Sequence, residues 1–271
     1  MSASLGRLFI YPVKSAAGIE CGQVQLTPQG FRHDREWMIV DAAGRFLTQR
    51  EEGRLALLST AIEGDRLRLS VPSGQSIAID VGHGGPSVAV QVWSAHCQAF
   101  DAGREAAQFL ADFLGRPLRL VRFDMSRPRY SAAEWTAGQE VPTLFSDGYP
   151  LLVLSQASID DLSARVGHEL PVQRFRPNIL LSGIAPYAED AASVLESGEV
   201  RLQLTKACTR CAITTINHLS GERTGEEPLA TLKSYRFDRA LRGVVFGRNA
   251  YALAGVGGTL TRAAPASIIS E

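Results

Sequence analysis

The sequence predicts a β-rich α+β protein with few helices. Short runs of β-branched and aromatic residues recur along its 271 residues, broken by Gly, Pro and Asp. Apolar residues at helical spacing are confined to a few segments, so strands do not alternate with helices as in a doubly wound sheet. Hydrophobic residues make up 45% of the chain, and its length indicates about two domains. We therefore expect β-barrel domains with sizeable cores.

The first half of the chain is expected to hold many strands and one clear helix. Short apolar runs predict strands at 8–10, 24–26, 37–40, 46–47, 67–69, 77–79, 88–92 and 118–121. A helix is predicted over 106–114, because its apolar residues share one face and Gly115 and Pro117 follow as stop signals. Residues 124–147 are polar and contain several prolines, which predicts a linker with some ordered contacts. We therefore divide the chain into domains 1–123 and 124–271.

The second half is expected to combine strands with two short helices. The first helix is predicted over 155–166, with its apolar residues on one face and Gly167 just beyond its end. The second begins at Pro228 and extends to Tyr235. Strands are predicted at 150–154, 178–181, 200–204, 211–216 and 246–253.

The charge balance excludes one class of protein. The chain has 28 Lys and Arg residues against 28 Asp and Glu residues, whereas a general nucleic-acid coat protein carries a basic excess. Residues 1–15 lack a charged segment followed by a long apolar stretch, so no signal peptide is expected. No segment approaches the roughly 18 apolar residues of a membrane span. We therefore expect a cytoplasmic protein that binds neither nucleic acid nor membrane.

The strongest chemical feature is the motif Cys208-Thr209-Arg210-Cys211. It could be half of a zinc site, although the two other cysteines stand alone. It could be a thioredoxin-like redox pair, although it precedes a β-prone segment instead of a helix. It could hold a single thiolate ligand beside Arg210, whose charge lowers the pKa of a thiol. Two ordinary buried cysteines are the remaining interpretation, and four cysteines are too few for an added iron–sulfur cluster.

A second feature is a scattered set of cations in strand or turn contexts: Lys14, Arg32, Arg35, Arg50, Arg174, Arg176 and Arg210. If they converge, they form a pocket for a small anionic ligand, since guanidinium groups bind phosphate through paired hydrogen bonds. Ser15 would add a hydroxyl donor beside Lys14. The alternative is that these are separate, solvated charges at strand edges. Phosphate-loop, nucleophile-elbow and zinc-protease motifs are absent from the sequence.

Several motifs, taken in their order along the chain, resemble the MOSC family, which is named for the carboxy-terminal domain of molybdenum cofactor sulfurases. The resemblance is to its two-domain branch, which includes amidoxime-reducing components. The matching segments are 11–15 and 30–38 in the first domain, and 145–147, 155–158, 174–179, 210–211 and 227–236 in the second. This resemblance implies an N-terminal MOSC β-barrel-like domain followed by a MOSC β-barrel domain with few helices.

The resemblance also implies a bound molybdenum cofactor in its molybdopterin form. Cys211 matches the family's molybdenum ligand and is expected to be the catalytic residue as well. The positions that match cofactor contacts are Lys14, Ser15, Arg35, Ser146, Arg176, Asn178, Thr209, Arg210 and Cys211. A soft thiolate suits a molybdenum ion that dithiolene sulfurs already hold. The anionic phosphate of the cofactor needs cations, and asparagine can pair with pterin edges.

The function implied by the resemblance is reduction of N-hydroxylated compounds (hydroxylamines, amidoximes and N-hydroxylated bases) to amines or amidines. Two electrons come from a separate donor protein, ferredoxin-like or a cytochrome or reductase, and the N–O oxygen leaves as water. One alternative is a carrier that delivers the cofactor, or sulfur held as a persulfide on Cys211. Another is a barrel that has lost the cofactor and only binds partners. We expect a monomer, with His218 as a candidate proton donor by position.

Overall fold

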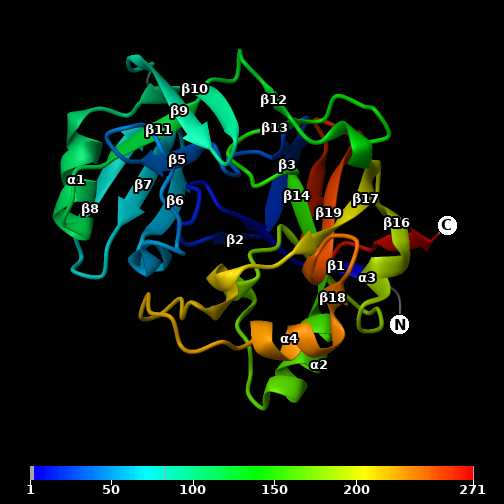
Figure 1. Ribbon diagram of the computed structural model, residues 1–271. Coiled ribbons are helices and arrows are strands. Elements are labelled where there is room, and N and C mark those ends of the chain that lie inside the picture. The colour runs from blue at the N-terminus through cyan, green and yellow to red at the C-terminus, as the bar shows by residue number, and fades with distance from the viewer. Residues whose placement is uncertain (1–2, 83, 271) are drawn as a thin grey trace.

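Strands dominate the structure, a computed structural model that describes residues 3–82 and 84–270 (Figure 1). The predicted β-rich α+β class is confirmed. Within the described residues the α-helices are few and short: α1 (Arg104–Leu114), α2 (Gln156–Val166), α3 (Ala188–Ala191) and α4 (Leu229–Tyr235). None of them is long and apolar enough to cross a membrane.

The largest sheet joins strands from both ends of the chain. Its order is β2 (Ile19–Cys21), β1 (Ser4–Ile10), β15 (Ile179–Ser182), β14 (Leu151–Ser155), β19 (Gly243–Ala254), β17 (Val200–Thr209), β16 (Ala192–Ser197) and β21 (Ser267–Ser270), with β18 (Phe237–Asp238) also paired to β19. In Figure 1, blue β1 lies among the green and orange strands of this sheet. The N-terminal strand therefore completes a sheet of the C-terminal half, and the division at residue 123 remains a prediction.

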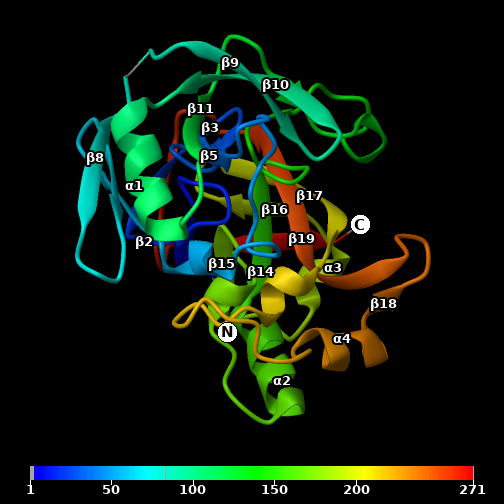
Figure 2. The same cartoon turned by 60° about the vertical axis from the view of Figure 1, so that its left-hand side comes forward.

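Smaller sheets surround this one. One has four strands in the order β5 (Trp37–Val40), β11 (Arg119–Phe123), β10 (Ala95–Asp101) and β9 (Ser87–Val92). Two have three strands: β3 (Gln23–Thr27) lies between β4 (Gly30–Phe31) and β20 (Thr259–Thr261), and β7 (Arg66–Ser70) lies between β6 (Ser59–Glu63) and β8 (Ser76–Asp80). The last pairs β12 (Arg129–Tyr130) with β13 (Pro142–Thr143). Helix α1 contacts β8 and β11, which Figure 2 shows at its two sides.

The two helices predicted to end before a glycine are confirmed at those ends. Helix α1 ends at Gly115, whose φ of 73° is the left-handed conformation that favours glycine. Helix α2 begins after Ser155, whose hydroxyl accepts a hydrogen bond from the Ser158 backbone N–H, and it ends at Gly167 with φ 88°. Each helix therefore ends where its glycine predicts, and α2 starts one residue later than predicted because Ser155 is its N-cap.

The strand predicted at 211–216 is wrong, and the strand predicted at 46–47 is reduced to an isolated bridge between Val40 and Phe46. The predicted linker is more structured than expected. Residues 211–216 contain the 3₁₀ helix η4 (Ala212–Thr215), because the hydroxyls of Thr214 and Thr215 bond to the carbonyls of Cys211 and Ala212 and satisfy a tight turn. The segment 124–147 contains β12, η2 (Ala133–Trp135) and β13, and its last residues line the pocket described below.

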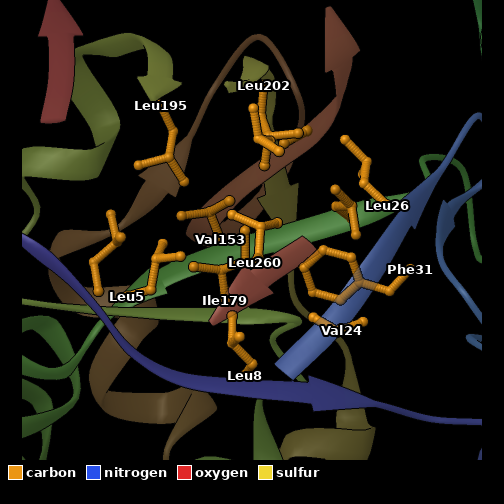
Figure 3. Packing of buried hydrophobic residues seen from close by; sticks show 14 of the residues in the cluster. Leu5, Leu8, Val24, Leu26, Phe31, Val153, Ile179, Leu195, Leu202 and Leu260 are labelled. Carbon is orange, nitrogen blue, oxygen red and sulfur yellow. The ribbon is translucent and has the colours of Figure 1, made fainter. Parts of the chain in front are cut away.

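The main core lies where the N-terminal strands meet the large sheet. In Figure 3, Leu8 of β1 and Leu26 of β3 pack in one cluster with Val153, Leu202 and Leu260 from the C-terminal half. A second core packs α1 against the sheet that contains β7. The main core contains residues from both ends of the chain, so it packs the N-terminal strands against the C-terminal half.

Truncation of this core is expected to destabilise the whole protein. Leu202 is fully buried, so Leu202→Ala should lower the free energy of unfolding by about 2–5 kcal/mol, through lost burial and the cavity left behind. Leu253, which is 39% exposed on β19, is the matched control. Equilibrium denaturant unfolding measures both, and an equal loss for the two variants would contradict the assignment of the core.

Candidate functional site

One pocket collects all the residues that the sequence predicts to contact a cofactor. Its lining includes Lys14, Ser15, Arg35, Ser146, Arg176, Asn178, Thr209, Arg210 and Cys211. The sheet explains part of this convergence: β14 and β15 run parallel and β1 runs antiparallel to β15, so the end of β1 and the starts of β14 and β15 meet at one edge. Whether each residue touches a cofactor remains a prediction.

The pocket is strongly cationic although the chain as a whole is neutral. Among the described residues its lining contains five cations and a single carboxylate: Lys14, Arg35, Arg50, Arg176, Arg210 and Asp147. Of the other cations singled out in the sequence, Arg32 is exposed and bonds to Gln25, and Arg174 lines a neighbouring pocket. The scattered cations therefore converge in large part, which favours the anion-pocket interpretation over separate surface charges.

Two guanidinium groups stack on one buried aromatic ring. The guanidinium carbons of Arg35 and Arg176 lie 4.3 and 4.2 Å from the centroid of the Tyr11 ring. Arg35 also donates to Asp34 at 2.5 Å. Burial, together with the charge of Arg35, lowers the pKa of Arg176 to about 10. Arg176 is therefore still a cation at neutral pH, and both groups are fixed before any ligand arrives.

Asn178 holds Arg35 in place. Its amide oxygen accepts hydrogen bonds from Arg35 Nη1 at 3.0 Å and from the Leu152 N–H at 3.1 Å. Its amide nitrogen donates to the Phe9 carbonyl at 3.2 Å. The observed role of Asn178 is thus to position a cation, and its pairing with a pterin edge stays a prediction.

Lys14, Asp147 and Trp93 form a hydrogen-bonded group at one wall of the pocket. Lys14 Nζ donates to the Phe145 carbonyl at 2.8 Å and to Asp147 Oδ1 at 2.6 Å, and Trp93 Nε1 donates to the same carboxylate oxygen at 3.1 Å. Burial lowers the pKa of Lys14, and the Asp147 carboxylate opposes this change. The guanidinium carbon of Arg50 lies 4.3 Å from the centroid of the Trp93 ring. Sequence reasoning did not place Asp147 or Trp93 at the site.

Backbone strain is concentrated around the same pocket. Nine non-glycine residues of the described chain have positive φ, and four of them line it: Ser15 (66°), Arg35 (52°), Trp93 (55°) and Arg176 (56°). Such conformations persist where the surrounding structure over-determines them, and they cluster at functional sites. The strain therefore marks this pocket independently of its charge.

The cysteine motif divides its two thiols between different roles. Arg210 Nη1 donates to Cys208 Sγ at 3.1 Å, so the thiol beside the guanidinium is Cys208. Cys211 is a free, partly exposed cysteine that caps η4 and lines the pocket. Within the described residues no group of three or more His, Cys, Asp or Glu side chains could hold a metal, so the structure adds no support to the zinc interpretation. The segment directly after Cys211 is the 3₁₀ helix η4 and not an α-helix, so the thioredoxin-like interpretation lacks its structural context.

The donor set fits a molybdopterin cofactor. Its phosphate and dithiolene groups are anionic, and the pocket offers five cations. The Nε atom of Arg210 is buried without a hydrogen-bond partner in the protein, as expected of a donor kept for a ligand. Cys211 supplies a soft sulfur in the same pocket.

The structure does not place His218 in the pocket, although its sequence position made it a candidate proton donor. His218 lines a neighbouring pocket together with Arg174, and it does not line the pocket that contains Cys211. Burial and the nearby Arg174 lower its pKa. His218 therefore lies outside the lining of the pocket that contains Cys211, and its role as proton donor remains a prediction.

These features define a class of strand-rich proteins with one cationic, cysteine-containing pocket. Residues 2–117 match the family model of the MOSC N-terminal beta barrel domain, and residues 140–260 match that of the MOSC domain. The chain is 35% identical over 256 residues to mitochondrial amidoxime-reducing component 1 of Mus musculus, covering 90% of this chain and 75% of that protein.

Two human proteins give similar values. Identity is 34% over 244 residues with mitochondrial amidoxime-reducing component 1 of Homo sapiens and 32% over 248 residues with component 2. In both cases 86% of this chain and 72% of the relative are covered. The chain belongs to the MOSC family, in the two-domain branch of these amidoxime-reducing components.

Proposed function

We propose that this protein is a molybdenum-cofactor-dependent oxidoreductase that reduces N-hydroxylated compounds, such as amidoximes, to amines or amidines. The observation that carries the proposal is the convergence of nine residues from separate chain segments on one cationic pocket with a free thiol. The names of the relatives, which are amidoxime-reducing components, support the substrate class.

Different residues of the pocket would bind different parts of the cofactor. Lys14, Arg35, Arg176 and Arg210 would bind its anionic groups, and Cys211 would supply the thiolate ligand to the metal. When bound, the cofactor supplies the two-electron redox chemistry. The net reaction consumes two electrons and two protons, converts one N–OH group to N–H and releases one water. The fixed guanidinium groups of Arg35 and Arg176 need little rearrangement to bind an anion.

The electrons would come from a separate protein, either ferredoxin-like or a cytochrome or reductase. All four cysteines are free in the structure, and the proposed use of Cys211 leaves too few for an iron–sulfur cluster. We further propose that the protein acts as a monomer in the cytoplasm.

Metal analysis combined with turnover tests the proposal. Protein produced with molybdate should keep about one molybdenum per chain through dialysis and convert benzamidoxime to benzamidine, with two electrons taken from a reduced dye per product. Protein produced with tungstate in place of molybdate is the matched control and should be inactive. Absence of molybdenum after cofactor-replete expression would exclude the enzyme. Tight cofactor without turnover, or labile sulfur on Cys211, would favour the carrier instead.

A further inference from the structure

A second pocket lies next to the pocket that contains Cys211, which we call the cofactor pocket, and the proposed reaction does not use it. We call it the seam pocket, because its lining comes from both family domains, for example Gln49 and Pro72 from the first, and Arg174 and His218 from the second. Its volume is about 300 Å³, within the range of small-molecule sites, which favour domain interfaces. It shares Arg176 and Ile213 with the cofactor pocket.

The seam pocket contains buried nitrogen atoms without hydrogen-bond partners. The Nε atom of Arg174 and the Nδ1 atom of His218 are both buried and have no hydrogen-bond partner in the protein. Buried polar atoms are almost always paired, so two orphans in one pocket indicate a missing partner. Arg174 is otherwise fixed, because its Nη1 donates to the Thr214 carbonyl at 3.0 Å. The pocket therefore combines a fixed guanidinium group with two unpaired, buried nitrogen atoms.

The charge and shape of the pocket select the ligand. Its lining contains the guanidinium groups of Arg174 and Arg176 and, among the described residues, no carboxylate. The rest is largely aliphatic, including Ala56 and Ile216, and Leu219 at the pocket is 79% exposed. Guanidinium groups bind carboxylate or phosphate, and aliphatic walls bind a compact apolar body. The lining thus matches a small amphipathic anion.

We propose that the seam pocket binds a small organic anion, with one carboxylate or phosphate group held by Arg174 and His218 and a compact apolar body against the aliphatic wall. The site is separate from the cofactor pocket but touches it. Gln49 of the seam pocket donates to the Ser15 carbonyl at 2.6 Å, and Ser15 lines the cofactor pocket. An anion bound there would lie against Arg176, a residue of both pockets.

Calorimetric titration of the purified full chain tests this site. Benzoate and phenyl phosphate serve as the two anionic probes and distinguish the carboxylate from the phosphate source, and benzamide is the neutral probe of the same shape. We expect one of the anions to bind at one site per chain and benzamide not to bind. Arg174→Gln should weaken binding by about tenfold or more, the effect of losing a charge-assisted hydrogen bond.

Three further variants keep the test decisive if Arg174→Gln does not fold. Ser59→Phe places a large side chain in the seam pocket from an exposed position and should block the anion, and His218→Ala should weaken its binding. Arg50→Gln removes a cation of the cofactor pocket alone and should leave binding unchanged. The site is refuted if neither anion binds, if benzamide binds equally well, if Ser59→Phe binds like the wild type, or if Arg50→Gln abolishes binding.

Discussion

Cys211→Ala is expected to abolish reduction of benzamidoxime, whereas Cys208→Ala should lower it only about tenfold. The two thiols are three residues apart, but only Cys208 has the Arg210 guanidinium as its partner, at 3.1 Å. If Cys211 is the metal ligand, its loss removes the protein's covalent hold on the cofactor. Loss of Cys208 releases only a group that orients Arg210, an effect of about 10-fold, as is typical for groups that support a metal ligand. The Cys211 effect should clearly exceed this.

Molybdenum content and turnover, measured on the same preparations, check this expectation. Cys21→Ala is the matched control, because Cys21 is also a free, partly buried cysteine but lies on β2 and does not line the pocket. It should behave like the wild type in both measurements. Normal turnover by Cys211→Ala would contradict the assignment of Cys211, and the reverse order of effects would transfer the ligand role to Cys208.

The sequence was most informative where local chemistry determines the structure. The helices at 106–114 and 155–166 could be predicted because their apolar residues share one face and because Gly115 and Gly167 end them through their own backbone conformation. The strand predicted at 211–216 failed because Thr214 and Thr215 use their hydroxyls to stabilise a tight turn. β-branched side chains favour strands only when they pack on a pleated surface.

At the site, too, residues in local sequence motifs could be predicted, whereas contacts between distant residues could not. Lys14, Arg176 and Cys211 could be named because each stands in a motif of several residues. Asp147 stands in such a motif too, but its contact with Trp93 joins residues that are 54 positions apart along the chain, and Trp93 has a positive φ. No spacing rule predicts that contact. A signal was present in the sequence, since Asp147 directly follows the predicted site residue Ser146.

Removal of the Asp34 carboxylate is expected to be the most destabilising change near the site. Asp34 is 2% exposed; it accepts from the Tyr11 N–H at 2.7 Å and from Arg35 Nη1 at 2.5 Å. Asp34→Ala leaves a largely buried guanidinium without its counter-charge and a backbone donor without an acceptor. Breaking a buried pair in this way should lower the free energy of unfolding by about 3–5 kcal/mol. Equilibrium urea unfolding measures the loss.

Two comparison variants separate the stability of the fold from the function of the site. Glu63→Ala breaks an exposed ion pair with Arg68, which water screens, so it should change stability very little. Asp34→Asn keeps an acceptor for the Tyr11 N–H but loses the charge, so it should fold better than Asp34→Ala. It should nevertheless retain less molybdenum than the wild type, because Arg35 no longer has a carboxylate that orients it in the pocket. If Asp34→Asn retains molybdenum fully, Asp34 supports the fold alone, and Asn178 suffices to position Arg35.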